Sequence, residues 1–157
     1  MKIIHVWSVL CGQSVINSDN NQISLLNLME KLDINSVIKN AKDLEKDINV
    51  PISYEIVSFW VKSNEAKELK GLVDLSVISP DNVEKNLFTN KFEMSPTITR
   101  LRTRFKINGL VVKDNGIYTF VVKFRENEKD ESKEVARLPL EISINKKTQL
   151  ESNKKVS

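Results

Sequence analysis

Apolar and polar residues alternate with a period of two along most of the chain, which is the pattern of β-strands that bury one face. In residues 117–125, for example, one face carries Tyr118, Phe120, Val122 and Phe124. The same pattern covers residues 3–11, 22–32, 52–61, 72–78, 86–92, 97–107 and 133–144. Because each segment keeps a polar face, antiparallel sheets are favoured over a parallel α/β sheet. About eight such strands predict an all-β fold, a two-sheet antiparallel β-sandwich with immunoglobulin-like or C2-like Greek-key connections.

Residues 33–49 depart from this period. Their apolar residues recur at steps of three and four, namely Ile34, Val37, Ile38, Ala41, Leu44 and Ile48. Asn35 or Ser36 is suited to cap a helix start, and the intervening charged residues suit a solvated face. The segment therefore predicts one short amphipathic crossover helix over residues 36–46.

Clusters of Asn, Asp, Ser and Gly mark the turns between predicted strands. Residues 17–21 (NSDNN) separate the first two strands and predict a hairpin, and residues 114–116 (DNG) predict a second hairpin turn. Oxygen-rich clusters of this kind are also able to supply calcium ligands at a sandwich tip. Their turn-forming role is the favoured interpretation.

Length and charge indicate a single domain with a polar tail. The 157 residues fit one domain, which we place at residues 1–145, and we expect residues 146–157 to form a disordered tail. The net charge of +3 comes from that tail, which holds four lysines and one glutamate, so residues 1–145 are neutral overall. A neutral body argues against nucleic acid as a partner.

The chain holds a single histidine and a single cysteine, His5 and Cys11. A lone thiol forms no intramolecular disulfide and suits a reducing compartment, so we expect a cytoplasmic protein. Along one extended strand the two residues lie roughly 20 Å apart, too far to act as a catalytic dyad. Zinc needs more ligands than these two residues provide. We therefore expect neither an enzyme nor a bound cofactor or metal.

The apolar run at residues 3–11 is interpreted as a first strand, in preference to a signal or lipid-anchor segment. No stretch approaches the ~20 apolar residues of a membrane-spanning helix, so no membrane association is expected.

The sharpest surface feature is a row of alternate cations on the predicted strand 97–107, here called the basic row: Arg100, Arg102, Arg104 and Lys106. Neighbours in the row are ~6.6 Å apart on one face of a strand. The row is a candidate contact strip for an anionic partner. The alternative is a solvated strand face whose charges pair across the sheet with acids such as Asp74, Glu55 or Glu141.

Aromatic residues offer a second candidate surface. Trp7, Trp60 and Tyr54 lie in apolar strands, where a core role is the default, although the three could also form a stacking platform for a sugar.

Several stretches of the sequence form a recognisable set: residues 5–11 (HVWSVLC), 23–30 (ISLLNLME), 54–60 (YEIVSFW), 109–110 with 116–122 (GL and GIYTFVV), and 135–142 (VARLPLEI). Together they resemble an uncharacterised prokaryotic family of small immunoglobulin-like β-sandwich proteins. The resemblance covers most of the chain, and its opening motif is the most specific part. It implies a β-sandwich and assigns no activity.

Together these features predict a non-catalytic protein-interaction or structural module with an unknown protein partner. The alternative is a binder of a small anionic or sugar-like ligand, through the basic row or a loop tip. The sequence leaves the oligomeric state and the identity of the partner open.

Overall fold

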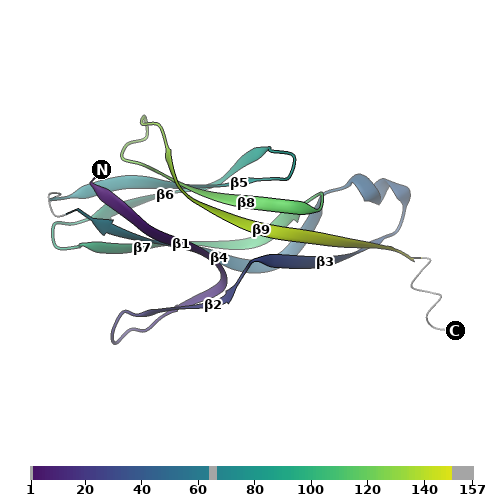
Figure 1. Ribbon diagram of the computed structural model, residues 1–157, viewed down its shortest axis with the longest axis horizontal. Helices are drawn as coiled ribbons and strands as arrows, with labels where there is room; N and C mark the ends of the chain where they lie inside the picture. The colour runs from purple at the N-terminus through teal and green to yellow at the C-terminus, as the bar shows by residue number, and fades with distance from the viewer. Residues whose placement is uncertain (1, 64–66, 150–157) are drawn as a thin grey trace.

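The computed structural model describes residues 2–63 and 67–149 and shows two β-sheets packed face to face (Figure 1). Sheet A has the strand order β2-β1-β4-β7 and sheet B the order β3-β9-β8-β5-β6. The described strands are β1 (Ile3–Ile16), β2 (Ile23–Leu28), β3 (Lys31–Ile38), β4 (Ile48–Lys62), β5 (Leu69–Ile78), β6 (Glu84–Met94), β7 (Arg100–Val112), β8 (Gly116–Arg125) and β9 (Lys133–Thr148). The predicted all-β sandwich is confirmed.

The core lies between the two sheets and consists of the alternating apolar positions read from the sequence. Trp60 of β4 is fully buried. Its ring centroid lies 6.2 Å from that of Phe92 of β6 and 5.9 Å from that of Phe124 of β8. Its indole Nε1 donates to Thr103 Oγ1 of β7 at 3.0 Å. Gly71 makes room for this cluster, because a Cβ there would lie 2.4 Å from Phe124 Cε2.

The predicted helix over residues 36–46 is wrong in its first part. Residues Lys31–Ile38 form strand β3, and only a short 3-10 helix, Ala41–Glu45, follows. Ile34 and Ile38 are buried on the same face of the strand, whereas Val37 is exposed. A spacing of four residues fits both a helix and a strand, so the inward pair was compatible with either.

β3 runs parallel to β9, in contrast to the antiparallel pairing of the other strands. Its pairing extends from Lys31↔Glu141 to Ile38↔Thr148. Strand β9 therefore continues three residues past the predicted domain boundary at residue 145, because residues 146–148 still belong to it. Residues 150–157 of the predicted tail lie outside the described residues.

The turn at residues 114–116 was predicted to close a hairpin, and this is also wrong. β7 belongs to sheet A and β8 to sheet B, so the turn carries the chain from one sheet to the other. The buried Tyr118 fastens this corner: its hydroxyl accepts from the backbone N–H of Lys113 at 3.1 Å and donates to the carbonyl of Asp114 at 3.1 Å. Such a bond from a tyrosine to the backbone a few residues upstream is a corner motif of immunoglobulin-like sandwiches.

The β1–β2 hairpin, predicted from residues 17–21, is confirmed, and it leaves the plane of sheet A. β1 pairs with β4 from Ile3 to Cys11 and with β2 from Cys11 to Ile16. β1 changes from pairing with β4 to pairing with β2 at Cys11, next to Gly12, where a Cβ would lie 3.2 Å from Asn27 Cβ. Figure 1 shows the hairpin, in purple, turning below the sheets at the lower left. No helix among the described residues is long and apolar enough to cross a membrane.

Candidate anion-binding groove

The basic row lies on β7 with its side chains on the outer face of sheet A. Phe105, between Arg104 and Lys106, and Ile107, directly after the row, are buried in the core, as the alternation predicted. β7 is the last strand of sheet A, and it pairs with β4 so that Arg102 stands opposite Phe59 and Arg104 opposite Val57. The row therefore borders an outer sheet surface that is apolar on the neighbouring strand.

The β1–β2 hairpin folds over this outer surface and contacts the middle of the row. Arg102 donates through Nη1 to Asn21 Oδ1 at 3.2 Å and through Nη2 to the Asn21 carbonyl at 2.9 Å. Arg104 donates through Nη1 to Ser14 Oγ at 3.2 Å. Both partners are neutral groups, so the hairpin orients the two guanidinium groups without supplying a carboxylate of its own.

The acids proposed from the sequence as partners of the row are not bound to it. Asp74 lies in sheet B and pairs with Arg125, whose Nε is 3.1 Å from Asp74 Oδ2. Glu55 is adjacent in register, opposite Lys106, but its Oε2 accepts from the Ser14 backbone N–H at 3.1 Å and from the Ser14 hydroxyl. Glu141 lies on β9 of sheet B. Among residues 2–63 and 67–149, no ion pair joins any carboxylate to the basic row.

Between the hairpin tip and β7 lies a cavity of about 510 Å³, here called the groove. It is lined by Ile16, Asn20, Asn21, Gln22, Phe59, Arg100, Leu101 and Arg102. Arg100 is exposed and has no partner in the described part of the chain. The tip itself is held by Asn20, whose Oδ1 accepts from the Gln22 backbone N–H at 3.0 Å and whose Nδ2 donates to Gln22 Oε1 at 3.1 Å.

The aromatic residues considered as a sugar platform are divided between the two faces of sheet A. Trp60 and Tyr54 are buried in the core, and burial raises the pKa of Tyr54 to about 12. Trp7 is only partly buried and lies beside Phe59, with 5.7 Å between ring centroids. Trp7 and Phe59 stand opposite each other in the β1–β4 pairing, on the face that carries the groove. The predicted three-residue platform is therefore not assembled.

Sequence reasoning missed the part of the groove that the hairpin supplies. Asn20 and Asn21 belong to a cluster interpreted as a turn, with calcium binding as the alternative, and Gln22 and Phe59 were taken as strand residues. The available signal was the run of amide side chains, which offer donors and acceptors beyond what a turn needs.

His5 and Cys11 lie on opposite faces of β1. His5 packs edge-on against Trp60, and its Nε2 is 2.7 Å from Ser8 Oγ, which in turn is 2.7 Å from Ser58 Oγ. Burial lowers the pKa of His5. Cys11 is fully buried opposite Glu55, and burial, reinforced by the nearby Glu55 charge, raises the pKa of its thiol. This arrangement gives neither residue the other as a partner.

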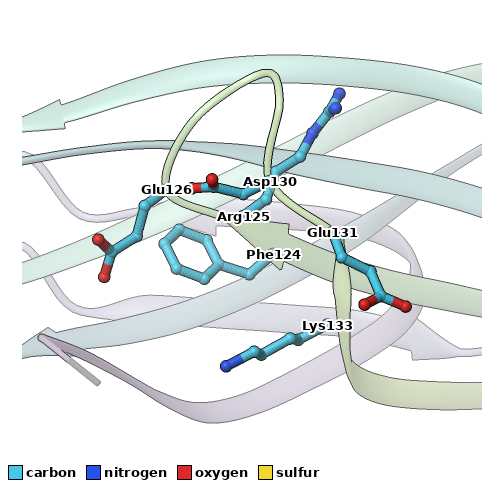
Figure 2. A pocket seen from close by; sticks show the side chains of 6 residues that line it. All are labelled: Phe124, Arg125, Glu126, Asp130, Glu131 and Lys133. Atoms are coloured by element: carbon cyan, nitrogen blue, oxygen red, sulfur yellow. The ribbon is translucent and has the colours of Figure 1, made fainter.

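A second pocket, of about 330 Å³, lies under the β8–β9 connection (Figure 2). Two of its charged residues already bind neighbouring groups. Arg125 donates a hydrogen bond to the Glu128 carbonyl and forms an ion pair with Asp74, and the Asp130 carboxylate accepts from the Asn127 side chain. Figure 2 shows the ring of Phe124 between Glu126 and Lys133. No group of three or more described His, Cys, Asp or Glu residues is placed to hold a metal ion.

No protein-family model matches the chain, and no curated protein sequence matches it. The family resemblance noted in the sequence therefore stays a prediction. Among solved structures, a family 123 glycoside hydrolase from Clostridium perfringens, described for glycolipid glycan hydrolysis, matches at 9% identity with a TM-score of 0.42, over 92% of this chain and 28% of that one. The N-terminal domain of PorA matches at 10% identity with a TM-score of 0.25, over 91% of this chain and 98% of that one. Likenesses this distant bear on neither the site nor the activity.

Proposed function

We propose that this chain is a non-catalytic binding module that captures an anionic ligand in the groove between the β1–β2 hairpin and β7. One observation carries the proposal: Arg100 and Arg102 line a cavity of about 510 Å³, and no carboxylate of residues 2–63 and 67–149 is bound to either. The buried free thiol of Cys11 supports a cytoplasmic setting, and the sequence resemblance supports a prokaryotic one.

Arginine suits this task because its planar guanidinium donates two parallel hydrogen bonds to a carboxylate or phosphate. The contacts of Arg102 with Asn21 fix its orientation before a ligand arrives, which reduces the conformational entropy lost on binding. Phe59 adds an apolar surface beside the cations. A small acidic sugar fits this combination as well as a carboxylate-bearing peptide does.

The test is to measure binding affinity by isothermal titration calorimetry at low ionic strength. Three probes are used: inorganic phosphate, glucuronate and an acetylated tri-glutamate peptide. The double variant Arg100→Gln/Arg102→Gln is compared with Lys39→Gln/Lys129→Gln, which removes the same charge from two exposed lysines far from the groove in sequence.

At least one probe is expected to bind the natural protein and the lysine variant alike. The arginine variant is expected to bind that probe at least about tenfold more weakly, which corresponds to one lost charge-assisted contact. Equal affinities for the two double variants, or no binding of any probe to the natural protein, would contradict the proposal.

A further inference from the structure

The outer edge of β7 carries a regular pattern of free backbone groups. Within the described residues β7 pairs only with β4, so its other edge has no strand partner. Just before β7, the Lys62 N–H donates to the Thr99 carbonyl at 2.9 Å, which makes these two residues a hydrogen-bonded pair of the antiparallel ladder. Hydrogen-bonded and non-hydrogen-bonded pairs alternate, so the N–H and C=O groups of alternate residues beginning with Arg100 point away from β4.

Those residues are the members of the basic row. The four cations therefore sit on the residues whose backbone N–H and C=O face the free edge. A strand added antiparallel there would form its hydrogen bonds with these residues and place its own side chains directly opposite theirs, on the same face. The side chains opposite Arg100 and Arg102 would then enter the groove.

We infer that the free edge of β7 receives an extended acidic peptide segment as an additional antiparallel strand of sheet A. The inference rests on the proposed function of the groove and specifies its ligand. Acidic residues at every second position match the row, and their carboxylates meet cations that form no ion pair within the described part of the chain. Addition of a strand to an open sheet edge is a recurring mode of peptide recognition.

The residues between the acids would face the open side of the sandwich, where an apolar side chain is available. Phe88 of β6 is 41% exposed and stacks on Phe105 of β7 with 6.1 Å between ring centroids. Apolar residues at the alternate positions of the peptide would cover this ring. The favoured ligand therefore alternates acidic and apolar residues, which distinguishes it from a compact anion.

A second copy of this chain is disfavoured as the occupant of this edge. Two β7 strands paired edge to edge would bring one basic row opposite the other, and like charges directly opposite in a sheet are destabilising. Cationic side chains on edge strands are a known protection against such self-pairing.

The probe is an acetylated, amidated eight-residue peptide in which glutamate and valine alternate, with affinity measured by titration calorimetry. Two N-methylated forms separate strand addition from simple charge attraction. Methylation of the glutamate amides removes the donors that face β7, whereas methylation of the valine amides removes donors that face solvent. Phosphate and heparin serve as anions without a peptide backbone.

The valine-methylated peptide is expected to bind like the parent peptide, and the glutamate-methylated one at least about tenfold more weakly. Amide hydrogen exchange at the four residues of the basic row is expected to slow with the parent peptide and to stay unchanged with phosphate. Equal affinities for the two methylated peptides would overturn strand addition and leave anion binding in the groove standing. Tighter binding of heparin with no peptide binding would overturn it in favour of a polysaccharide. Failure of every anion to bind would overturn the proposed function itself.

Discussion

A buried carboxylate, Glu55, helps to hold the hairpin that forms one wall of the groove against sheet A. Its side chain accepts from the backbone N–H of Ser14 at 3.1 Å and from the Ser14 hydroxyl, and both residues are buried. The hydroxyl also accepts from Arg104, so this contact joins β1, β4 and β7. We predict that Glu55→Ala loosens the hairpin while the sandwich stays folded, because the core between the sheets does not include this contact.

The size of the effect follows from the contacts. Hydrogen bonds to a charged acceptor contribute about 1.5–3 kcal/mol each, and removing the carboxylate also removes the cost of burying its charge. A net local loss of about 2 kcal/mol is therefore expected, which raises the open population of the hairpin roughly 30-fold.

Cys11 provides the assay, because it is the only cysteine and is fully buried where the hairpin leaves sheet A. When opening and closing are fast, the rate of thiol modification follows the open population. The modification rate of Glu55→Ala is expected to rise roughly 30-fold above that of the natural protein. The exposed-site variant Glu131→Ala is expected to match the natural rate.

One confounding effect has a matched control. The Glu55 charge helps to raise the pKa of Cys11, so its removal also increases the thiolate fraction. Glu55→Gln removes that charge and keeps an oxygen that accepts from Ser14, so its rate is expected to lie well below that of Glu55→Ala. Equal thiol-modification rates for Glu55→Gln and Glu55→Ala would refute the idea that the Glu55 hydrogen bonds hold the hairpin to sheet A. A rate for Glu55→Ala within about twofold of the natural protein's rate would refute it as well.

Three further predictions concern the sandwich itself. Tyr118→Phe is expected to lower the free energy of unfolding by about 1–3 kcal/mol, because the hydroxyl ties the corner between the sheets to Asp114; an unchanged urea midpoint would contradict this. Gly71→Ala is expected to cost about 1–3 kcal/mol in urea unfolding through overpacking against Phe124, and Phe124→Leu in the same chain should recover part of the loss. Burial alone would raise the pKa of the Asp74 carboxyl, but hydrogen bonds and a guanidinium outweigh burial and hold it below its ordinary value. The stabilisation from Asp74 is therefore present above the ordinary carboxyl pKa and lost as the pH falls through the lower folded value, so Asp74→Asn should flatten the decline in melting temperature below about pH 4.

The strand pattern could be predicted from the sequence because one face of each strand is buried. Along β8, Tyr118, Phe120, Val122 and Phe124 are all buried on the core side, as their alternation required. Strand β3 could not be predicted in this way, because Ser36 interrupts the row of apolar residues on its inward face. Its hydrogen-bonding partner β9 lies about a hundred residues away, and no local pattern reports such a pairing.

Turn chemistry likewise predicts where the chain reverses and leaves open which sheet it enters. Gly116 lies in the turn predicted for residues 114–116 and has a φ of +135°. Glycine adopts such a positive φ without steric cost. The strand that follows nevertheless joins sheet B. The reason is global: β7 and β8 contribute to opposite walls of one core, where Phe105 of β7 lies against Phe88 of β6 and Phe120 of β8 lies against Tyr54 of β4, and this arrangement depends on the other strands.

The outward direction of the basic row could be predicted, but the state of its charge could not. The alternative considered for the row was pairing with acids across the sheet, and on sheet B several cations do have such a partner: Arg125 pairs with Asp74, Lys123 with Glu84, and Arg137 with Glu134. On sheet A the one adjacent acid is engaged by the hairpin, and the hairpin offers the row only neutral oxygens. Overall neutrality therefore coexists with a local positive field along β7, because the compensating acids lie elsewhere. Exposed ion pairs contribute only about 0–1 kcal/mol each, so stability places little demand on pairing the row, and its charge remains available to an incoming ligand.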